Sequence, residues 1–566
     1  MPPSLRRRIG PVDTIWLNMD RPNNLMVIES LMFLGGVPDW DEVTELIRRR
    51  VVEPFPVFHQ RPETAGVSGV LGQPYWVDDE DFRLERHIRR FTLPSPGDDR
   101  TLQRHIEGYL DRPLDHGHPL WELHLIDGHG PGSAMFLRIH HSLADGIALT
   151  RVLMSLTEGD PADAAGPIPT TRVAPEATLA GAMDSPEVVA AVEAAVGTFE
   201  AVGQLEHLEL PAGAECGPGD ELPPADERGI VDDERGQVDE RGSALRLPTP
   251  PLVGAGLRLA RDGIGQLLRL STPGGLRDTA DLAVRTTRVV AQLLLTHNPP
   301  NPLDGAPGGT KRVVWSEPLP LVGPKQLGRL AGATLNDVLM SAVAAALHRY
   351  QLDKGADPVD LVTMVPVNVR PLDEPLPPEL GNRFALVFFR YPSALSAPLA
   401  RLAETKRRMD WLKHSPEAVL TFALITAIGR TTAGIERYIV DFFANKAIGV
   451  TTNVAGPRST RRLAGVPVTG VMGWVPGSGR QVVGVCIFTY AGTVRVGFMA
   501  DAAVVPDPEL LLAAFEDELD HLVHIGRPRP GRGKAAKAAK AGGKKQRKGP
   551  KAGAGKGHDA DRPRTA

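Results

Sequence analysis

The sequence predicts an α/β (α+β) protein built from two compact units. Apolar runs of strand length alternate with stretches of helical periodicity in residues 1–159 and again in 311–526. Between these units the composition shifts to Ala, Pro, Gly and acidic residues, and after the second unit it shifts to Lys, Ala and Gly. A chain of 566 residues has room for about two to four domains, so two mixed units fit its length.

The first unit, residues 1–159, shows strand and helix patterns in alternation. Residues 25–34 and 134–139 are apolar runs typical of buried strands. Helical periodicity occurs in three stretches, the first of which begins with an aspartate suited to a helix N-terminus: 39–52, 101–110 and 146–156.

The second unit, residues 311–526, is predicted to mix strands with two helices. The helices are expected at 334–350, with Asn336 and Asp337 in the first turn, and at 508–525. Strands are expected at 313–319, 361–367, 384–391, 448–453, 482–489 and 493–499. Residues 473–479 are predicted to form a flexible loop, because three glycines and a proline fall within this segment.

Three further segments lack the pattern of a packed core. Residues 160–250 are acidic, contain Asp-Glu-Arg-Gly three times, and are predicted to be a disordered insertion, because they bury too little apolar surface to offset their ordering entropy. Residues 251–310 regain helical periodicity and are expected to form a helical linker. Residues 527–566, with 14 Lys and Arg against 2 Asp and Glu, are predicted to be a disordered basic tail.

Composition narrows the cellular setting. Only Cys216 and Cys486 are present, so no disulfide framework is implied, and a reducing cytosol fits. The N-terminal arginines are not followed by the apolar run of a secretory signal. No stretch reaches the roughly 20 apolar residues that span a bilayer. The longest candidate, 418–429, is about half that length and is either a buried core helix or a surface helix that dips into lipid.

The segment from His140 to Gly146 carries the strongest chemical signal. It reads His-His-Ser-Leu-Ala-Asp-Gly and lies between a predicted strand and a predicted helix. Because side chains alternate along a strand, His140 and His141 should face opposite sides. Three interpretations compete: a metal site, for which no further cluster with ligand spacing is visible; two packed histidines; and a histidine general base beside a carboxylate.

The full set of motifs resembles one family. His-His-x-x-x-Asp-Gly is the signature of the coenzyme-A-dependent acyltransferase superfamily. That superfamily includes chloramphenicol acetyltransferase and the condensation domains of nonribosomal peptide synthesis. The neighbouring strings and their order resemble the bacterial wax ester synthase/diacylglycerol acyltransferase family over about residues 10–160 and 285–525. These strings are Pro119-Leu120-Trp121, Asn336-Asp337, Val-Pro-Val-Asn-Val-Arg-Pro at 365–371, Gly381-Asn382 and Asn453 to Pro457.

The resemblance implies two chloramphenicol-acetyltransferase-like halves with the active site in a tunnel between them. It also implies that His141 is the general base of a ternary reaction without an acyl-enzyme. Asp145 would hold the loop by pairing with an arginine, for which Arg370 is the best candidate. Asn336 is a candidate oxyanion donor or positioning residue, although Asn336 and Asp337 could equally cap their helix.

The remaining motif residues have supporting roles in this hypothesis. Gly146 would permit a tight turn into the following helix, and His140 has no chemical duty. Pro119, Leu120 and Trp121 would lie near the acyl tunnel or belong to the core. Asn453 to Pro457 is expected to be a turn. Neither a metal nor a cofactor is expected, since acyl-CoA is a substrate.

Three functions follow from these expectations. The first is an enzyme that transfers a long-chain acyl group from acyl-CoA to diacylglycerol, with wax ester synthesis from a fatty alcohol as its alternative. The second is a non-catalytic protein that binds lipid or coats droplets. The third is a stand-alone condensation domain, although no carrier segment is present. The tail is expected to draw a cytoplasmic protein to an anionic membrane or lipid droplet, and nucleic acid is a less favoured partner.

Overall fold

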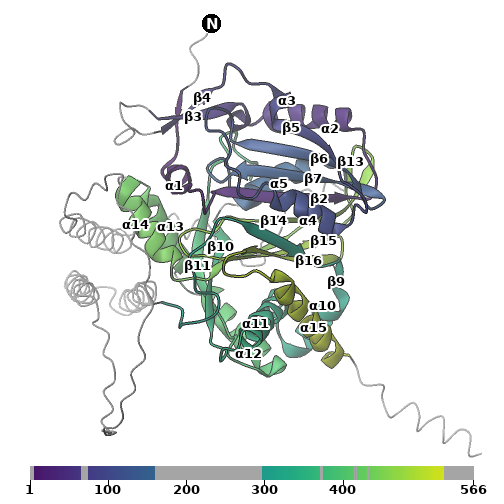
Figure 1. Cartoon of the computed structure of the whole chain (residues 1–566), viewed down its shortest axis with the longest axis vertical. Helices are drawn as coiled ribbons and strands as arrows, with labels where there is room; N and C mark the ends of the chain where they lie inside the picture. The colour runs from purple at the N-terminus through teal and green to yellow at the C-terminus, as the bar shows by residue number, and fades with distance from the viewer. Residues whose placement is uncertain are drawn as a thin grey trace, which may run out of the picture.

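The computed structural model describes residues 6–64, 74–159, 296–369, 374–413, 415, 417–429 and 433–527. It has three β-sheets and helices packed around them (Figure 1), which confirms the mixed α/β class. The predicted insertion at 160–250, most of the linker and nearly all of the basic tail lie outside the described residues. The described part of the linker, 296–310, forms turns and extended chain without a helix.

The first half of the chain forms a small three-stranded sheet and supplies four strands of a six-stranded sheet. Its strands are β1 (Arg7–Arg8), β2 (Val27–Leu34), β3 (Gln60–Thr64), β4 (Pro74–Asp78), β5 (Ile88–Thr92), β6 (Trp121–His129) and β7 (Gly132–His140). Its α-helices are α1 (Pro11–Met19), α2 (Trp40–Ile47), α3 (Leu84–His87), α4 (Asp99–Glu107) and α5 (Gly146–Ser155). One π-helical turn (Arg48–Val52) continues α2, and a 3-10 turn covers Pro56–Phe58.

The second half forms a seven-stranded sheet with helices around it and adds two strands to the six-stranded sheet. Its strands are β8 (Lys311–Trp315), β9 (Leu319–Pro320), β10 (Leu361–Asn368), β11 (Phe384–Tyr391), β12 (Gly449–Ala455), β13 (Arg462–Leu463), β14 (Val466–Trp474), β15 (Val483–Tyr490) and β16 (Thr493–Asp501). Its helices are α10 (Val322–Ala331), α11 (Leu335–Asp353), α12 (Pro398–Lys413), α13 (Glu417–Ile428), α14 (Ala433–Ala444) and α15 (Pro508–Ile525).

Local chemistry explains the helix starts that the sequence predicted. Asp39 caps α2 by accepting the N–H groups of Asp41 and Glu42. Thr334 and Asp337 form a reciprocal capping box at the start of α11. The bounds of β11 and α15 match the predicted 384–391 and 508–525.

The main correction concerns β14, which the sequence did not predict. This strand lies in the second half of the chain but pairs with β2, in the order β13-β14-β2-β7-β6-β5. Gly473 and Trp474, expected in a flexible loop, end this strand, and Trp474 is buried. The six-stranded sheet therefore contains strands from both sequence units, so its boundary does not coincide with the boundary between those units.

Helix α13 resolves the question posed by the apolar stretch at 418–429. Ala418, Leu424 and Ile428 are buried in contact with the rest of the protein, as a core helix requires. Among the described residues, no single helix is long and apolar enough to cross a bilayer. The pair α10 and α11 passes by length and composition, but it is bent by 100° and α11 is a core helix.

Candidate active site

The His140–Gly146 loop joins the two halves of the protein. Strand β7 is buried along its whole length and ends at His140, after which the backbone N–H of His141 donates to Met26 O at 2.7 Å. The N–H of Gly381 donates to Leu143 O at 3.2 Å. Leu380 and Gly381 both have positive φ, at 53° and 68°, and this turn brings the next residue, Asn382, to His141.

The side chain of His141 has a defined tautomer. Its Nδ1 lies 3.0 Å from Asn382 Oδ1. The Asn382 amide nitrogen donates to Asp13 Oδ1 at 2.8 Å and to His141 O at 2.7 Å. Two acceptors on that side fix the orientation of the amide, so its oxygen must face the imidazole. His141 Nδ1 therefore carries the proton, and Nε2 carries the lone pair.

The surroundings of His141 keep the imidazole neutral. The ring stacks on Trp16 with centroids 4.2 Å apart and lies 5.5 Å from the ring of Phe384. Burial lowers the pKa of His141 to about 4, although the hydrogen bonds and the nearby Asp145 act in the opposite direction. A neutral imidazole with a free Nε2 can accept a proton from a hydroxyl group.

Asp13 completes this group of polar residues from α1. Its Oδ1 accepts the backbone N–H of Asn382 at 2.9 Å in addition to the amide bond. Burial raises the pKa of Asp13 to about 6, and the two hydrogen bonds from Asn382 partly oppose that shift. Sequence reasoning missed Asp13 and Trp16. Pro11 at the helix start and Asp13 in the first turn could have indicated α1, but no local pattern linked that helix to His141.

His140 faces a different environment, as strand alternation predicted. Its Nδ1 lies 2.8 Å from Ser142 Oγ and accepts the Ser142 N–H at 3.2 Å. Its Nε2 lies 3.8 Å from Asp20 Oδ2, which is 3.3 Å from His116 Nε2. The fold thus gathers three groups of metal-ligand type that sequence spacing did not reveal. Because His140 Nδ1 is an acceptor, its Nε2 bears the hydrogen and faces Asp20 from beyond hydrogen-bond distance, whereas His116 is hydrogen-bonded to Asp20.

Asp145 holds the loop through backbone contacts. One carboxylate oxygen caps α5 by accepting the Ala148 N–H at 2.8 Å, and the other accepts the Arg383 N–H at 3.1 Å. Its expected partner Arg370 lies outside the described residues. The expected need for glycine at 146 finds no steric support, since a Cβ there would meet nothing within 4 Å. The chain turns into α5 at Asp145, the N-cap residue, whose backbone is extended.

Asn336 and Asp337 lie at the start of α11. Asp337 accepts the Thr334 N–H at 2.8 Å in the capping box. Asn336 is buried, and its hydrogen-bond partner is the Asn453 side chain rather than a residue of the His141 loop. Asn453 belongs to β12, not to the expected turn. This amide pair leaves one buried NH₂ donor and one carbonyl oxygen without partners.

Pro119, Leu120 and Trp121 are buried beside the strand that carries His140. Leu120 O accepts the His140 N–H at 2.9 Å, and the Trp121 indole donates to Phe58 O at 2.9 Å. Trp121 also lines an apolar cavity of about 20 Å³. These contacts make the tripeptide part of the first-half core that supports the site.

Comparisons with known proteins find related sequences and structures. Residues 9–215 match the model of the wax ester synthase/diacylglycerol acyltransferase catalytic domain, and residues 380–523 match the model of the WS/DGAT C-terminal domain. A Mycobacterium tuberculosis protein named as a diacylglycerol O-acyltransferase is 30% identical over 539 residues, which cover 91% of this chain and 97% of that protein.

The chain belongs to the wax ester synthase/diacylglycerol acyltransferase family. It is therefore an acyltransferase. A second Mycobacterium tuberculosis relative, also named as a diacylglycerol O-acyltransferase, is 25% identical over 520 residues and is covered to 94%. The solved wax ester synthase/diacylglycerol acyltransferase of Marinobacter aquaeolei has the same fold, with a TM-score of 0.55, 19% identity, and coverage of 92% of this chain and 99% of that one. The two-half architecture expected from the motifs is thus confirmed.

Proposed function

We propose that this acyltransferase moves a long-chain fatty acyl group from acyl-CoA to diacylglycerol and so forms triacylglycerol. The hydrogen bond from His141 to Asn382 carries this proposal, because it leaves Nε2 as a free base. The diacylglycerol acceptor is favoured by the names of the relatives at 30% and 25% identity. Wax ester synthesis from a fatty alcohol is the alternative, since the family name includes it.

In the proposed mechanism His141 acts directly on the acceptor alcohol. Nε2 accepts the hydroxyl proton as the oxygen attacks the thioester carbonyl carbon. The tetrahedral intermediate then expels the coenzyme A thiolate, which takes the proton back from the imidazolium. A positioned base of this kind accelerates a reaction by about 10²–10⁴, which corresponds to roughly 3–5 kcal/mol of activation free energy.

An acyl-enzyme is not required in this scheme. Within the described residues the cysteine is Cys486, which is buried, and burial raises the pKa of its thiol to about 11. A thiol of that kind is a poor nucleophile at neutral pH. The alcohol activated by His141 therefore attacks the thioester itself.

The intermediate also needs a donor for its negatively charged oxygen. The Asn336–Asn453 pair has one buried NH₂ group without a partner, and this group belongs to Asn336. We assign oxyanion stabilisation, or positioning of the acyl group, to Asn336 on this basis.

Contact with lipid surfaces is part of the proposal. Both substrates carry long apolar chains, and the tail at 527–566 has 14 basic residues against 2 acidic ones. Each basic residue close to an anionic membrane contributes about 1 kcal/mol of attraction. We propose peripheral association with the inner face of the membrane or with lipid droplets, and acyl-CoA as the cytoplasmic donor.

One assay tests the proposed reaction. The full chain is incubated with labelled palmitoyl-CoA and either diacylglycerol or hexadecanol, and the lipids are separated. Labelled triacylglycerol as the main product supports the proposal. Wax ester as the sole product would show that the acceptor is a fatty alcohol and not diacylglycerol. Lipid binding without product would indicate a non-catalytic lipid-binding protein, and an amide formed from carrier-bound acyl groups would indicate a condensation domain.

Two histidine variants sharpen that assay. His141→Ala should lose at least about 10²-fold in kcat with unchanged folding, because the base is gone. His521→Ala, which alters an exposed histidine of α15, should retain wild-type turnover. Wild-type rates in purified His141→Ala would exclude the mechanism.

A further inference from the structure

A cationic pocket lies at one end of β11. The other end of this strand begins at Phe384, whose ring packs against His141. The pocket is a cavity of about 230 Å³ at the edge of the seven-stranded sheet, beside α12. Its walls combine apolar residues of β10 and β11 with three arginines and an exposed indole: Val362, Phe388, Arg390, Arg407, Arg408 and Trp411. Such a combination suits a ligand with phosphate groups and an aromatic ring.

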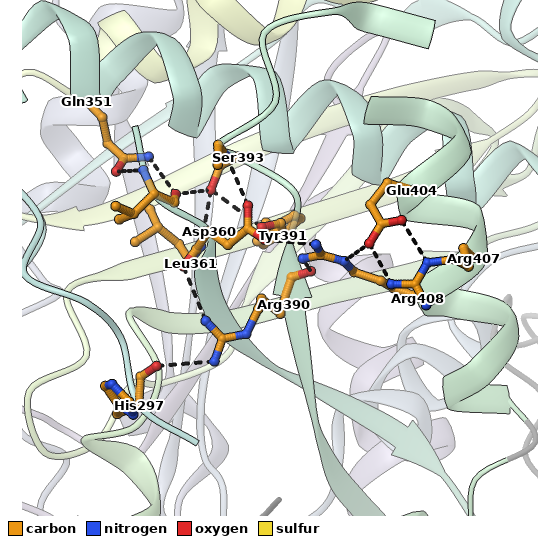
Figure 2. A network of polar contacts seen from close by, with 12 residues as sticks. His297, Gln351, Asp360, Leu361, Arg390, Tyr391, Ser393, Glu404, Arg407 and Arg408 are labelled. Carbon is orange, nitrogen blue, oxygen red and sulfur yellow. Dashed lines mark hydrogen bonds and ion pairs between the residues drawn. The ribbon is translucent and has the colours of Figure 1, made fainter. Parts of the chain in front are cut away.

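The charges of the pocket are incompletely balanced. Arg407 and Arg408 share the carboxylate of Glu404, and Arg408 also donates to Asp360 Oδ2 at 2.8 Å (Figure 2). Arg390 is half-buried and bonds only to carbonyl oxygens, those of His297 at 3.2 Å and Asp360 at 3.5 Å. Among the described residues no carboxylate oxygen lies within 4.0 Å of its guanidinium. A bound anion would offset this charge.

The guanidinium groups are held in place before any ligand arrives. Arg408 donates to Arg390 O at 2.9 Å, which fixes the end of α12 against β11. Figure 2 shows the Arg408 guanidinium held between Glu404 and the Asp360 carboxylate, whereas the Arg390 guanidinium points toward His297. Arg407 by contrast is 68% exposed, so exchanging its Glu404 contact for a phosphate contact costs little. Preorganised donors of this kind bind phosphate with a smaller entropy loss.

Trp411 selects among phosphate ligands. Its side chain is 38% exposed at the pocket wall, and an exposed indole offers a stacking face for a nucleobase, as in nucleotide-binding proteins. Arginines alone would serve a lipid headgroup equally well. The indole beside the three arginines favours a nucleotide.

Strand β11 connects the pocket with the site. Phe384, which touches His141, and Arg390 lie on the same face because side chains alternate along a strand. The six residue steps from Phe384 to Arg390 span about 20 Å at the usual rise of about 3.3 Å per residue. The arm that joins a thioester to the nucleotide of coenzyme A has about fifteen bonds and extends on the order of 20 Å. Arg390 is thus one extended coenzyme A arm away from the base.

We propose that this pocket binds the 3′-phospho-ADP end of acyl-CoA. The inference rests on the proposed function for the identity of the donor, but its direct test is a binding measurement. Arg390 and Arg408 hold the phosphates and Trp411 stacks on the adenine.

The test is a calorimetric titration of the full chain with 3′-phospho-ADP, adenosine or inorganic phosphate. The wild type should bind the nucleotide more tightly than either fragment. Arg390→Gln should weaken nucleotide binding about tenfold or more, since a charge-assisted hydrogen bond is lost. Arg349→Gln serves as the matched control, because Arg349 is 66% exposed on α11 and pairs with Asp353; its affinity should not change. Equal affinity of Arg390→Gln and the wild type would overturn the proposal, and so would binding to phosphatidic acid vesicles without binding to the nucleotide.

Steady-state kinetics separate this inference from the proposed function. Arg390→Gln should raise KM for palmitoyl-CoA with little change in kcat, and should leave turnover of palmitoyl-pantetheine, which lacks the nucleotide, unchanged. An equal loss with both donors would contradict a nucleotide site. Nucleotide binding that depends on Arg390, in a protein without acyl transfer, would retain the pocket and reject the reaction.

Discussion

The amide oxygen of Asn382 accepts the Nδ1 proton of His141 at 3.0 Å across a separation of 241 residues. Asp13, from a third part of the chain, holds the opposite end of the same amide. The tautomer of His141 is therefore set by two residues outside the His-His motif, and this relationship leads to several of the predictions below.

Replacing Asn382 should impair the base without removing it. In Asn382→Ala, His141 can adopt either tautomer, so kcat should fall about 10- to 100-fold, less than in His141→Ala. Asp13 Oδ1 and His141 O would each lose the buried hydrogen bond from the Asn382 amide nitrogen, which should cost about 1–3 kcal/mol of unfolding free energy. Initial rates and denaturant unfolding measure both effects, and wild-type kcat in this variant would contradict the tautomer argument.

The pH dependence of turnover should reflect a buried imidazole. Burial lowers the pKa of His141 from 6.5 to about 4, so Nε2 stays unprotonated as the pH falls through 6.5. We expect kcat/KM to hold between about pH 6 and 8 and to fall as the pH approaches 4. Rapid assays over this range, with stability checked in parallel, give the profile. A fall centred near pH 6.5 would show that His141 is more hydrated than the structure indicates.

Asp13 should make the stability of the protein decrease with rising pH. Its pKa is about 6 in the folded chain against 3.8 as the ordinary value, so the folded state binds the proton more tightly. Stability from this group is complete below pH 3.8 and is lost as the pH rises through about 6. Asp13→Asn keeps the oxygen that accepts from Asn382 but has no charge, and should remove this slope.

A comparison of variants isolates that contribution. The unfolding free energy of Asp13→Asn relative to the wild type should increase between pH 4 and pH 7, by on the order of 3 kcal/mol. The difference between the two proteins is the informative quantity, because burial also raises the pKa values of Glu29, Glu417 and Glu436. A difference that does not vary with pH would show that Asp13 is hydrated in the folded protein and keeps its ordinary pKa.

Asp145 should matter for stability more than for the chemistry. Asp145→Ala removes the cap of α5 and the acceptor of the Arg383 N–H, which together should cost about 2–4 kcal/mol. Asp145→Asn can still cap the helix, so its loss should be smaller. Thermal unfolding of both variants ranks them, and an unchanged midpoint in Asp145→Ala would argue against a structural role.

Deletion of 527–566 should weaken binding to anionic vesicles. The tail carries 14 basic residues, and its attraction to a charged surface is screened by salt. Cosedimentation with phosphatidylserine vesicles at low and high salt compares the full and shortened chains. Binding that is unaffected by the deletion would remove the tail from the membrane proposal.

Local signals in the sequence were sufficient for some elements and for choosing His141 as the candidate base. The capping pattern at Thr334 and Asp337 marked the start of α11, and the His-His motif identified His141. The sequence could not reveal β14, because strand pairing is a long-range property and Gly470 and Gly473 interrupt its apolar pattern. Asp13 and Trp16 were not predicted as site residues for a related reason, because only the packing of α1 brings them to His141.

The pairing of β14 with β2 has a consequence for how the protein is made. Strand β2 lies between β7, which ends at His140, and β14, which ends at Trp474. On the ribosome, β2 is synthesised more than 400 residues before its second neighbour. Until then the nascent chain presents an open apolar strand edge, which is prone to aggregation. The first half expressed alone would keep that edge permanently, so the sheet that carries His140 and His141 needs almost the whole polypeptide to be completed.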